Sequence, residues 1–407
     1  MAQQVEKLDH RTHILKLPDT YIGSVEKTTE ENWVFNVENE KVQKRVINFT
    51  PGEYKIFDEI VVNAIDQYTR LKEVNNVNLF SVKTIKIWAN KETGEISVYN
   101  DGEGIPVKLH EKEKIYIPEL IFGNLLTSSN YKEGEKKHVG GKNGYGAKLA
   151  NIFSTQFTIE TLDKQTGKKY IQSFYDNMKR RDKPKITKNS GKPYTKITYT
   201  PDYPRFKTKG LSDDMMKIIE KRAYDISAWT DPNVSVYFND VKISTKMFER
   251  YVDLFIGEKK ETPRAYEQIN DRWEVVATLN PTLQFEQISF VNGIYTTKGG
   301  KHVDAIVNQI TKKLVDYISK KKKVTVKQSY IRENIIIFIK STIDNPAFNS
   351  QTKECLTTTS NKFGSKFDVS QKFIDTLAKC GIIEKALELS SVKEINALKK
   401  SDGKKNT

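Results

Sequence analysis

The stretch GGKNGYGAKLANIF, Gly140–Phe153, decides how this chain is interpreted. It places four glycines and Lys148 at the start of a pattern that predicts a helix over Ala147–Phe153. Glycines let backbone N–H groups approach a phosphate because no Cβ intervenes, and the start of a helix adds positive partial charge. The spacing is not that of a Walker A loop, since no Gly-Lys-Ser or Gly-Lys-Thr follows at the required distance. The stretch therefore predicts a nucleotide loop of another kind.

Composition indicates a folded chain rather than a disordered or membrane-spanning one. Its 407 residues suffice for two or three domains, and 37% hydrophobic residues with 10% aromatics can form cores. The longest strongly apolar run, Ile335–Ile339, is far shorter than a bilayer span, and the N-terminal MAQQVEKLDH lacks a signal-like region. Cys355 and Cys380 are too few for a disulfide framework or a zinc site, which favours a reducing compartment.

The net charge of +15 is unevenly distributed along the chain. Between Lys298 and Lys327 there are nine lysines against Asp304 and Asp316, a surplus of seven. Such a concentration suggests a polyanionic partner, and nucleic acid is the first candidate. A solvated lysine-rich face would give the same composition, so charge alone leaves both interpretations open.

Periodicity predicts alternating helices and strands in the first two-thirds of the chain. The spacing of apolar residues over Lys55–Tyr68 predicts an amphipathic helix with a wide apolar face. Strand-like alternation over Thr84–Ala89 and Ile96–Tyr99, on either side of KETGE, predicts a hairpin. Further strands are expected at Lys192–Thr200 and Val234–Phe238.

A second α+β domain is expected after a linker at Gly257–Arg264, since the pattern blurs between Lys242 and Thr262. Its predicted elements are strands at Trp273–Leu279 and Gln287–Val291, a helix at His302–Lys320, a strand at Ile335–Ser341 and helices within Ser370–Leu389.

Polar residues upstream of the glycine stretch could serve a nucleotide, although each has a plainer interpretation. Glu59 and Asn63 lie one helical turn apart, where a carboxylate and an amide oxygen could activate water and hold Mg²⁺. Asn100 ends a strand, where its amide could contact an adenine edge. Residues 125–131, LLTSSNY, precede a charged loop that could be a lid. Taken singly, these are equally a solvated helix face, a tight turn and a surface loop.

Downstream, Gln351-Thr352-Lys353 occupies a polar loop of the second expected domain. A solvated lysine is the default interpretation. If Lys353 instead reached a γ-phosphate, the second domain would sense hydrolysis.

In order and spacing, these segments together resemble the GHKL (Bergerat-fold) ATPases, and most closely the ATPase region of eukaryotic-type (type IIA) DNA topoisomerases II. The similarity covers nearly the whole chain. It is carried by LPDTYIGS, IFDEIVVNA, NDGEGIP, IYIPELIFGNLLTSSNY, GGKNGYGAKLANIFST, ISFVNGIYTTKGGKHVD, ENIIIFI and DNPAFNSQTKECLTT.

The resemblance implies a role for each matching residue. Glu59 would be the general base, Asn63 would bind Mg²⁺ and the nucleotide, Asn100 would contact adenine, and Lys353 would assist catalysis at the γ-phosphate. The remaining expected ATP contacts are Ser128, Ser129, Asn130, Gly141, Lys142, Asn143, Gly144, Tyr145, Gly146, Ala147, Lys148, Gln351 and Thr352. Lys320, Lys321, Lys322 and Lys323 match a basic loop that would touch DNA.

Two positions depart from the family pattern. Gln67 stands where Asn is common after Asp66, and Glu103 replaces a common basic residue. An ion pair between position 103 and Asp66 is thereby removed, and the two carboxylates could repel. We therefore assign no catalytic role to either acid.

The implied fold is α+β, with a GHKL sandwich of helices on a mixed sheet over residues 1–245. A smaller transducer domain with a β-α-β core would occupy 246–381, and a C-terminal helix and tail 382–407. The enzymes it resembles continue into a DNA-cleaving region, so the chain looks like an N-terminal fragment of one.

The implied mechanism is an ATP-driven gate. ATP·Mg²⁺ would dimerise the chain around a DNA duplex, with an N-terminal arm reaching the second subunit, and hydrolysis would reset the gate. The location would be nuclear, or host cytoplasm or virion for a large DNA virus. The alternatives are an Hsp90-like or histidine-kinase-like ATPase, and a nucleotide-independent DNA-binding module whose glycines are structural turns.

Overall fold

The computed structural model describes residues 7–74, 76–125, 136–141 and 144–402, with side chains described as far as residue 392. The chain divides into two compact units, Met1–Tyr251 and Val252–Thr407. The division lies within helix α7 (Phe248–Ile256), which occupies part of the region where the sequence pattern blurred. The linker expected from that blurred pattern is thus preceded by a regular helix with Phe248, Tyr251 and Val252 buried.

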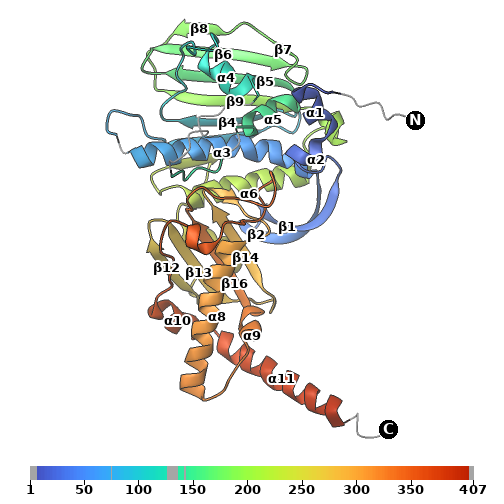
Figure 1. Cartoon of the computed structure of the whole chain (residues 1–407), viewed down its shortest axis with the longest axis vertical. Helices are drawn as coiled ribbons and strands as arrows, with labels where there is room; N and C mark the ends of the chain where they lie inside the picture. The colour runs from blue at the N-terminus through green and yellow to red at the C-terminus, as the bar shows by residue number, and fades with distance from the viewer. Residues whose placement is uncertain (1–6, 75, 126–135, 142–143, 403–407) are drawn as a thin grey trace, which may run out of the picture. The chain divides into compact units, whose positions relative to one another are not determined.

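The first unit is built on a nine-stranded sheet (Figure 1). The strands are β3 (Thr84–Ala89), β4 (Ile96–Asp101), β5 (Ser154–Asp163), β6 (Lys168–Tyr175), β7 (Arg180–Arg181), β8 (Lys185–Lys188), β9 (Tyr194–Pro201), β10 (Ser235–Phe238) and β11 (Val241–Lys242). They run in the order β11-β10-β3-β4-β9-β5-β6-β7, with β8 also paired to β6. The pairing of β10 with β3 is parallel and the others are antiparallel, so the expected mixed sheet is confirmed.

One face of this sheet is covered by helices. Alternate strand residues such as Ile85, Ile87, Val98 and Ile159 are fully buried there, as a period of two requires. The covering helices are α3 (Pro51–Val74), α4 (Ile117–Gly123), α5 (Gly146–Ile152) and α6 (Asp213–Trp229). Figure 1 shows α3 running along the sheet as the longest of them.

Two smaller pieces complete the first unit. A two-stranded antiparallel ribbon, β1 (Thr28–Asn36) and β2 (Lys41–Phe49), packs on α6, where Phe35 stacks on Tyr224 at 4.1 Å between ring centroids. Ahead of the ribbon are the short helices α1 (His10–Lys16) and α2 (Pro18–Tyr21), and a 3-10 turn, η1 (Tyr203–Phe206), follows β9.

Helix α3 is fixed to α6 by buried charge. The guanidinium of Arg222 donates from Nε to Asp58 Oδ1 at 2.8 Å, and Asp225, one turn further on α6, pairs with Lys221 Nζ at 3.0 Å. Tyr251 of α7 donates its hydroxyl to Asp225 Oδ1 at 2.6 Å. All five side chains are buried, and removing one member of such a network leaves an uncompensated charge in a low dielectric.

The second unit has a five-stranded sheet in the order β12-β13-β16-β14-β15. Its elements are β12 (Ala265–Asn270), β13 (Trp273–Leu279), β14 (Glu286–Val291), β15 (Ile294–Tyr295), α8 (Lys301–Lys322), α9 (Gln328–Arg332), β16 (Ile335–Ser341), η2 (Ser360–Lys362), α10 (Gln371–Leu377) and α11 (Ile382–Asp402). β14 and β16 are parallel neighbours joined through α8, which is the expected β-α-β core.

The core of the second unit lies between this sheet and its helices. Ile306, Ile310, Leu314 and Ile318 repeat every four residues along α8 and are fully buried. The central strand β16 is buried on both faces, and Phe338 meets Phe255 of α7 edge-on at 5.3 Å between ring centroids. Such burial explains why β16 reads as the longest apolar run of the sequence instead of as an alternating strand.

None of the helices in the described ranges is long and apolar enough to cross a membrane.

Candidate functional site

Glu59, the expected general base, lies on the buried side of α3. Glu59 is 3% exposed, and its Oε1 is 2.6 Å from Nζ of Lys55, one turn earlier on the helix. Sequence reasoning did not single out Lys55, although the i, i+4 spacing was visible. Lysine four residues before glutamate is usually a weak surface pair, and only burial makes this one significant.

Gly146 at the start of α5 allows Glu59 to approach the glycine stretch. A Cβ on Gly146 would lie 2.0 Å from Glu59 Oε2, so any side chain there would displace the carboxylate. The φ of Gly146 is not positive, so its backbone conformation does not require glycine. Glycine is needed here because α5 packs closely against α3. Ala147 and Lys148 follow it in the first turn of α5.

Asp66 holds the beginning of the glycine stretch. Its Oδ1 accepts from the N–H of Gly140 at 2.7 Å and its Oδ2 from the N–H of Gly141 at 2.9 Å. Asp66 is 1% exposed, so this is a buried, doubly charge-assisted contact. We assigned Asp66 no catalytic role, and the structure gives it a structural one. In this conformation the Gly141 N–H is donated to Asp66, so its predicted phosphate contact requires the loop to rearrange.

The side chain of Lys148, on α5, reaches back to the glycine turn that precedes the helix. Its Nζ donates to the carbonyl of Gly144 at 2.5 Å, and Gly144 adopts a left-handed φ of 67°. The side chain is buried, and burial lowers the pKa of Lys148 to about 8. A buried ammonium next to a turn of glycines is suited to a bound polyanion, which would restore a preference for the charged form.

Asn63 is half-buried on α3, one turn beyond Glu59. Its side-chain amide makes no hydrogen bond with any residue that the structure describes, so its carbonyl oxygen can accept a ligand. An amide oxygen beside a carboxylate fits Mg²⁺, which keeps several waters and takes few protein ligands. Among the described residues no group of three or more His, Cys, Asp or Glu could hold a metal ion.

Asn100 is the second-to-last residue of β4 and is buried, with its Nδ2 donating to the carbonyl of Asp101 at 2.9 Å. Asp101 Oδ1 in turn accepts from the N–H groups of Lys83 and Thr84, both at 2.7 Å. Asp101 thereby ties the end of β4, next to Asn100, to the start of β3.

The two positions that depart from the family pattern contact each other. Gln67 donates from Nε2 to the carbonyl of Glu103 at 3.0 Å, while Glu103 Oε1 accepts from the N–H of Phe80 at 2.8 Å. Glu103 and Asp66 thus each have their own backbone donors. These hydrogen bonds stabilise the negative charge of both carboxylates, which the sequence suggested could repel each other.

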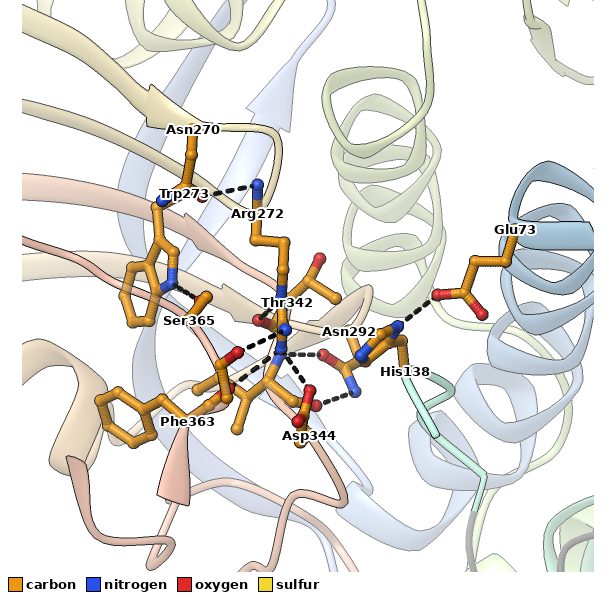
Figure 2. Close-up of polar contacts among 12 residues, drawn as sticks. Glu73, His138, Asn270, Arg272, Trp273, Asn292, Thr342, Asp344, Phe363 and Ser365 are labelled. Atoms are coloured by element: carbon orange, nitrogen blue, oxygen red, sulfur yellow. Dashed lines mark hydrogen bonds and ion pairs between the residues drawn. The ribbon is translucent and has the colours of Figure 1, made fainter. Parts of the chain in front are cut away.

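Part of the expected site lies outside the described residues: Ser128, Ser129, Asn130, Lys142 and Asn143. The segment that returns from this gap is attached to the end of α3, where His138 Nδ1 contacts Glu73 Oε1 (Figure 2). Neither residue was predicted to matter, because their 65-residue separation carries no local signal.

Tyr145 connects the glycine stretch to the N-terminal helices. Its hydroxyl is 3.4 Å from Nε2 of His10, and the two rings meet edge-on at 5.7 Å between centroids. Tyr21 lies at 6.1 Å from the same ring and contacts His13 Nδ1 through its hydroxyl at 3.0 Å. Helices α1 and α2 therefore rest on the glycine stretch of their own chain.

The remaining predicted residues belong to the second unit. Gln351 and Thr352 form a turn, and Lys353 is buried with a left-handed φ of 63°. Lys320–Lys322 end α8 and Lys323 caps it, all four exposed, so like charges gather at one helix end.

Comparisons with known proteins agree with this geometry. Residues 52–177 match the family described as "Histidine kinase-, DNA gyrase B-, and HSP90-like ATPase", and residues 236–405 match "DNA gyrase B". DNA topoisomerase 2 of Saccharomyces cerevisiae is 44% identical over 419 residues, which cover 99% of this chain and 29% of that protein. DNA topoisomerase 2 of Arabidopsis thaliana is also 44% identical, covering 100% of this chain and 27% of its own length.

Solved structures extend the similarity to the fold. The ATPase region of Saccharomyces cerevisiae topoisomerase II superposes with a TM-score of 0.88 at 42% identity, covering 96% of this chain and 99% of that one. The ATPase and transducer domains of DNA topoisomerase II from Balamuthia mandrillaris give the same TM-score at 39% identity. The chain spans less than a third of the curated relatives' length and nearly all of these solved regions.

Lys148 predicts a pH dependence of nucleotide affinity. Its pKa of about 8 means that raising the pH from 7 to 9 removes most of its charge in the nucleotide-free protein. If binding needs the cation, affinity for an ATP analogue should fall by about tenfold over this range. Conversely, the unfolded chain binds the extra proton between pH 8 and 10.5, so this group makes the nucleotide-free fold more stable as pH rises through that window.

Equilibrium titration with a fluorescent ATP analogue at pH 7, 8 and 9 measures the effect. Lys148→Met should bind more weakly and lose most of the pH dependence, whereas the exposed Lys164→Met should behave as wild type. An equal slope in Lys148→Met and wild type would show that Lys148 is not the titrating group.

Proposed function

Because the chain belongs to the topoisomerase II family and corresponds to its ATPase region, we propose that it is the ATP-hydrolysing gate of a type II DNA topoisomerase. The observation that carries this proposal is the contact of Glu59 with the start of α5, which brings a buried carboxylate to a glycine turn with a buried lysine. A base, a phosphate-binding turn and a cation at one place are what hydrolysis of a phosphoanhydride needs.

In this proposal Glu59 accepts a proton from the attacking water, and Lys55 orients its carboxylate. Asn63 would hold Mg²⁺, which when bound neutralises charge on the phosphates. Lys148 and the amides of Gly144–Ala147 would bind the triphosphate, and Asn100 would contact adenine. Gln351, Thr352 and Lys353 would approach the γ-phosphate from the second unit, now proposed as a transducer domain.

The wider cycle follows from the family and is likewise a proposal. ATP·Mg²⁺ would bring two copies together around a DNA duplex, and hydrolysis would let the domains move and release the gate. The exposed lysines at the end of α8 would contact the DNA. Such an enzyme would act in the nucleus, or in host cytoplasm or virion if a large DNA virus is the source. The 42% identity to the yeast ATPase region favours this function over an Hsp90-like or kinase-like one.

Replacing the base tests the proposal directly. Glu59→Gln should keep ATP binding but lose hydrolysis by about a hundredfold to ten-thousandfold, the usual contribution of general base catalysis. Steady-state phosphate release and analogue binding measure the two properties, with exposed Glu92→Gln as the matched control. Unchanged turnover in a folded Glu59→Gln protein would refute the assignment of the base.

Nucleotide-dependent dimerisation is the second prediction. With a non-hydrolysable ATP analogue and Mg²⁺, light scattering should report twice the monomer mass, because the analogue keeps the closed state. Glu59→Gln should reach the same state with ATP itself. A chain that stays monomeric with saturating analogue would contradict the gate.

The α8 lysines predict how DNA affects hydrolysis. Changing Lys320–Lys323 to glutamine should reduce DNA stimulation of ATP turnover and flatten its salt dependence, by a log–log slope of about 0.9 for each DNA phosphate that is no longer neutralised. The control changes Lys183, Lys185 and Lys188, which are also exposed, to glutamine. Stimulation that persists unchanged would make the α8 lysines an ordinary solvated helix end.

A further inference from the structure

A short segment that leads into the first residue of α8 is hydrogen-bonded to the loop that contains Lys353. We call Lys298–Lys301 the glycine clamp and residues 349–356 the Lys353 loop. Lys298 N–H donates to the Glu354 carbonyl, Leu356 N–H donates to the Gly299 carbonyl, and Lys301 N–H donates to the Leu356 carbonyl, each at 3.0 Å. Lys298 Nζ also pairs with Glu354 Oε2 at 2.6 Å. The residues next to Lys353 are thus held by backbone bonds to one segment.

Gly300 makes this close approach possible. Its φ of 129° lies where L-residues with side chains are strained, and a Cβ would come within 2.4 Å of the Leu356 carbonyl oxygen. Because the obstacle is backbone, it can yield only if the Lys353 loop itself moves. Gly299, in contrast, has a positive φ but only side-chain neighbours at 3.4 Å or more.

The clamp is anchored on the sheet by a buried polar cluster. Thr296 N–H donates to the Ser289 carbonyl at 2.9 Å, and the two hydroxyls lie 2.6 Å apart. Gln287 donates from Nε2 to the carbonyls of Thr296 at 3.2 Å and Thr297 at 3.0 Å. Ser289 and Thr296 are fully buried on and beside β14, so the clamp has a rigid base.

The stem of the surrounding loop is closed independently by Arg272. Its guanidinium donates to the carbonyls of Thr342 and Phe363, both at 2.9 Å, and to Asp344 Oδ1 at 2.7 Å, as Figure 2 shows. Residues before and after the Lys353 loop are thereby tied together. The stem and the clamp thus tie the backbone on either side of Lys353 to defined partners.

We propose that the glycine clamp is a positioning element for Lys353, through which Gly300 and the Lys298–Glu354 pair set the rate of ATP hydrolysis without contacting the nucleotide. The inference rests on the proposed function, and in particular on a role for Lys353 at the γ-phosphate. Gly300 also caps the start of α8, but the clamp holds the backbone on the C-terminal side of Lys353 directly. Disturbing these loop contacts therefore changes the chemical step and leaves nucleotide binding to the first unit intact.

Gly300→Ala tests the clamp. We expect kcat to fall by about tenfold to a hundredfold, the effect of displacing a catalytic group by about an ångström, with KM for ATP within about twofold of wild type. Gly167→Ala is the matched control, since Gly167 has a positive φ of 62° and open space around it. Wild-type kcat in a folded Gly300→Ala protein would overturn the proposal.

A double-variant cycle separates positioning from general damage. If the clamp acts through Lys353, Gly300→Ala added to Lys353→Ala should cause no further decrease in kcat. Decreases that multiply would overturn the proposal. A wild-type chain that does not hydrolyse ATP would instead refute the proposed function. A fully active Lys353→Ala protein would refute the role of Lys353. Both outcomes are distinct from a failure of the clamp.

The exposed ion pair provides a variant that does not threaten folding. Lys298 and Glu354 side chains are 66% and 34% exposed, so Glu354→Lys should fold, with kcat lowered by about twofold to fivefold. Adding Lys298→Glu restores the pair with its charges exchanged and should recover most of the activity. A swapped pair no better than Glu354→Lys would count against positioning by this contact.

Discussion

Burial of charge along α3 is the constraint on which the first unit depends. Most of the surface of this helix is buried, and several of its buried side chains are ionisable. A group that stays ionised there needs a partner, because an unpaired charge in the interior costs several kcal/mol. Buried Glu53 meets the constraint differently, since burial raises the pKa of its carboxyl to about 7 and favours the neutral form. Asp58 pairs with Arg222 of α6, Glu59 with Lys55, and Asp66 with the amides that open the glycine stretch. The same requirement thereby fixes a neighbouring helix and a loop.

The glycines of GGKNGYGAK serve different physical purposes once they are seen in place. Gly144 supplies a left-handed turn, which only its φ reveals. Gly146 supplies space for Glu59, and Gly141 supplies an N–H and space for Asp66, whose Oδ2 would lie 2.9 Å from an added Cβ. Close packing against Glu59 and Asp66 is thus a second reason for glycine in this stretch, beside the proposed contacts of its backbone amides with phosphate.

In the second unit, the regular elements follow from local sequence patterns, whereas one long loop is held by long-range contacts. Its β-α-β core follows from strong periodicity, since α8 has an apolar stripe and β16 is apolar throughout. The polar loop between β16 and α10 has no such pattern, yet it is held by many hydrogen bonds. Arg272 and the glycine clamp lie 55 to 91 residues from the loop residues that they hold. Polar loops owe their order to these distant donors.

Periodicity and motif spacing are local properties, and they were enough to predict the order and type of most elements, the α+β class, the β-α-β core and the family. It also singled out Glu59, Asn63 and Lys148, which occupy two adjoining helices. It did not reveal α7, nor the importance of Lys55, Asp66, His138 and Gly300. Those depend on burial and on partners far along the chain, and a residue's environment exists only after the chain has folded. The burial of the Lys55–Glu59 pair and the approach of Gly300, unlike Gly299, to the backbone of Leu356 both depend on segments that meet only in the folded chain.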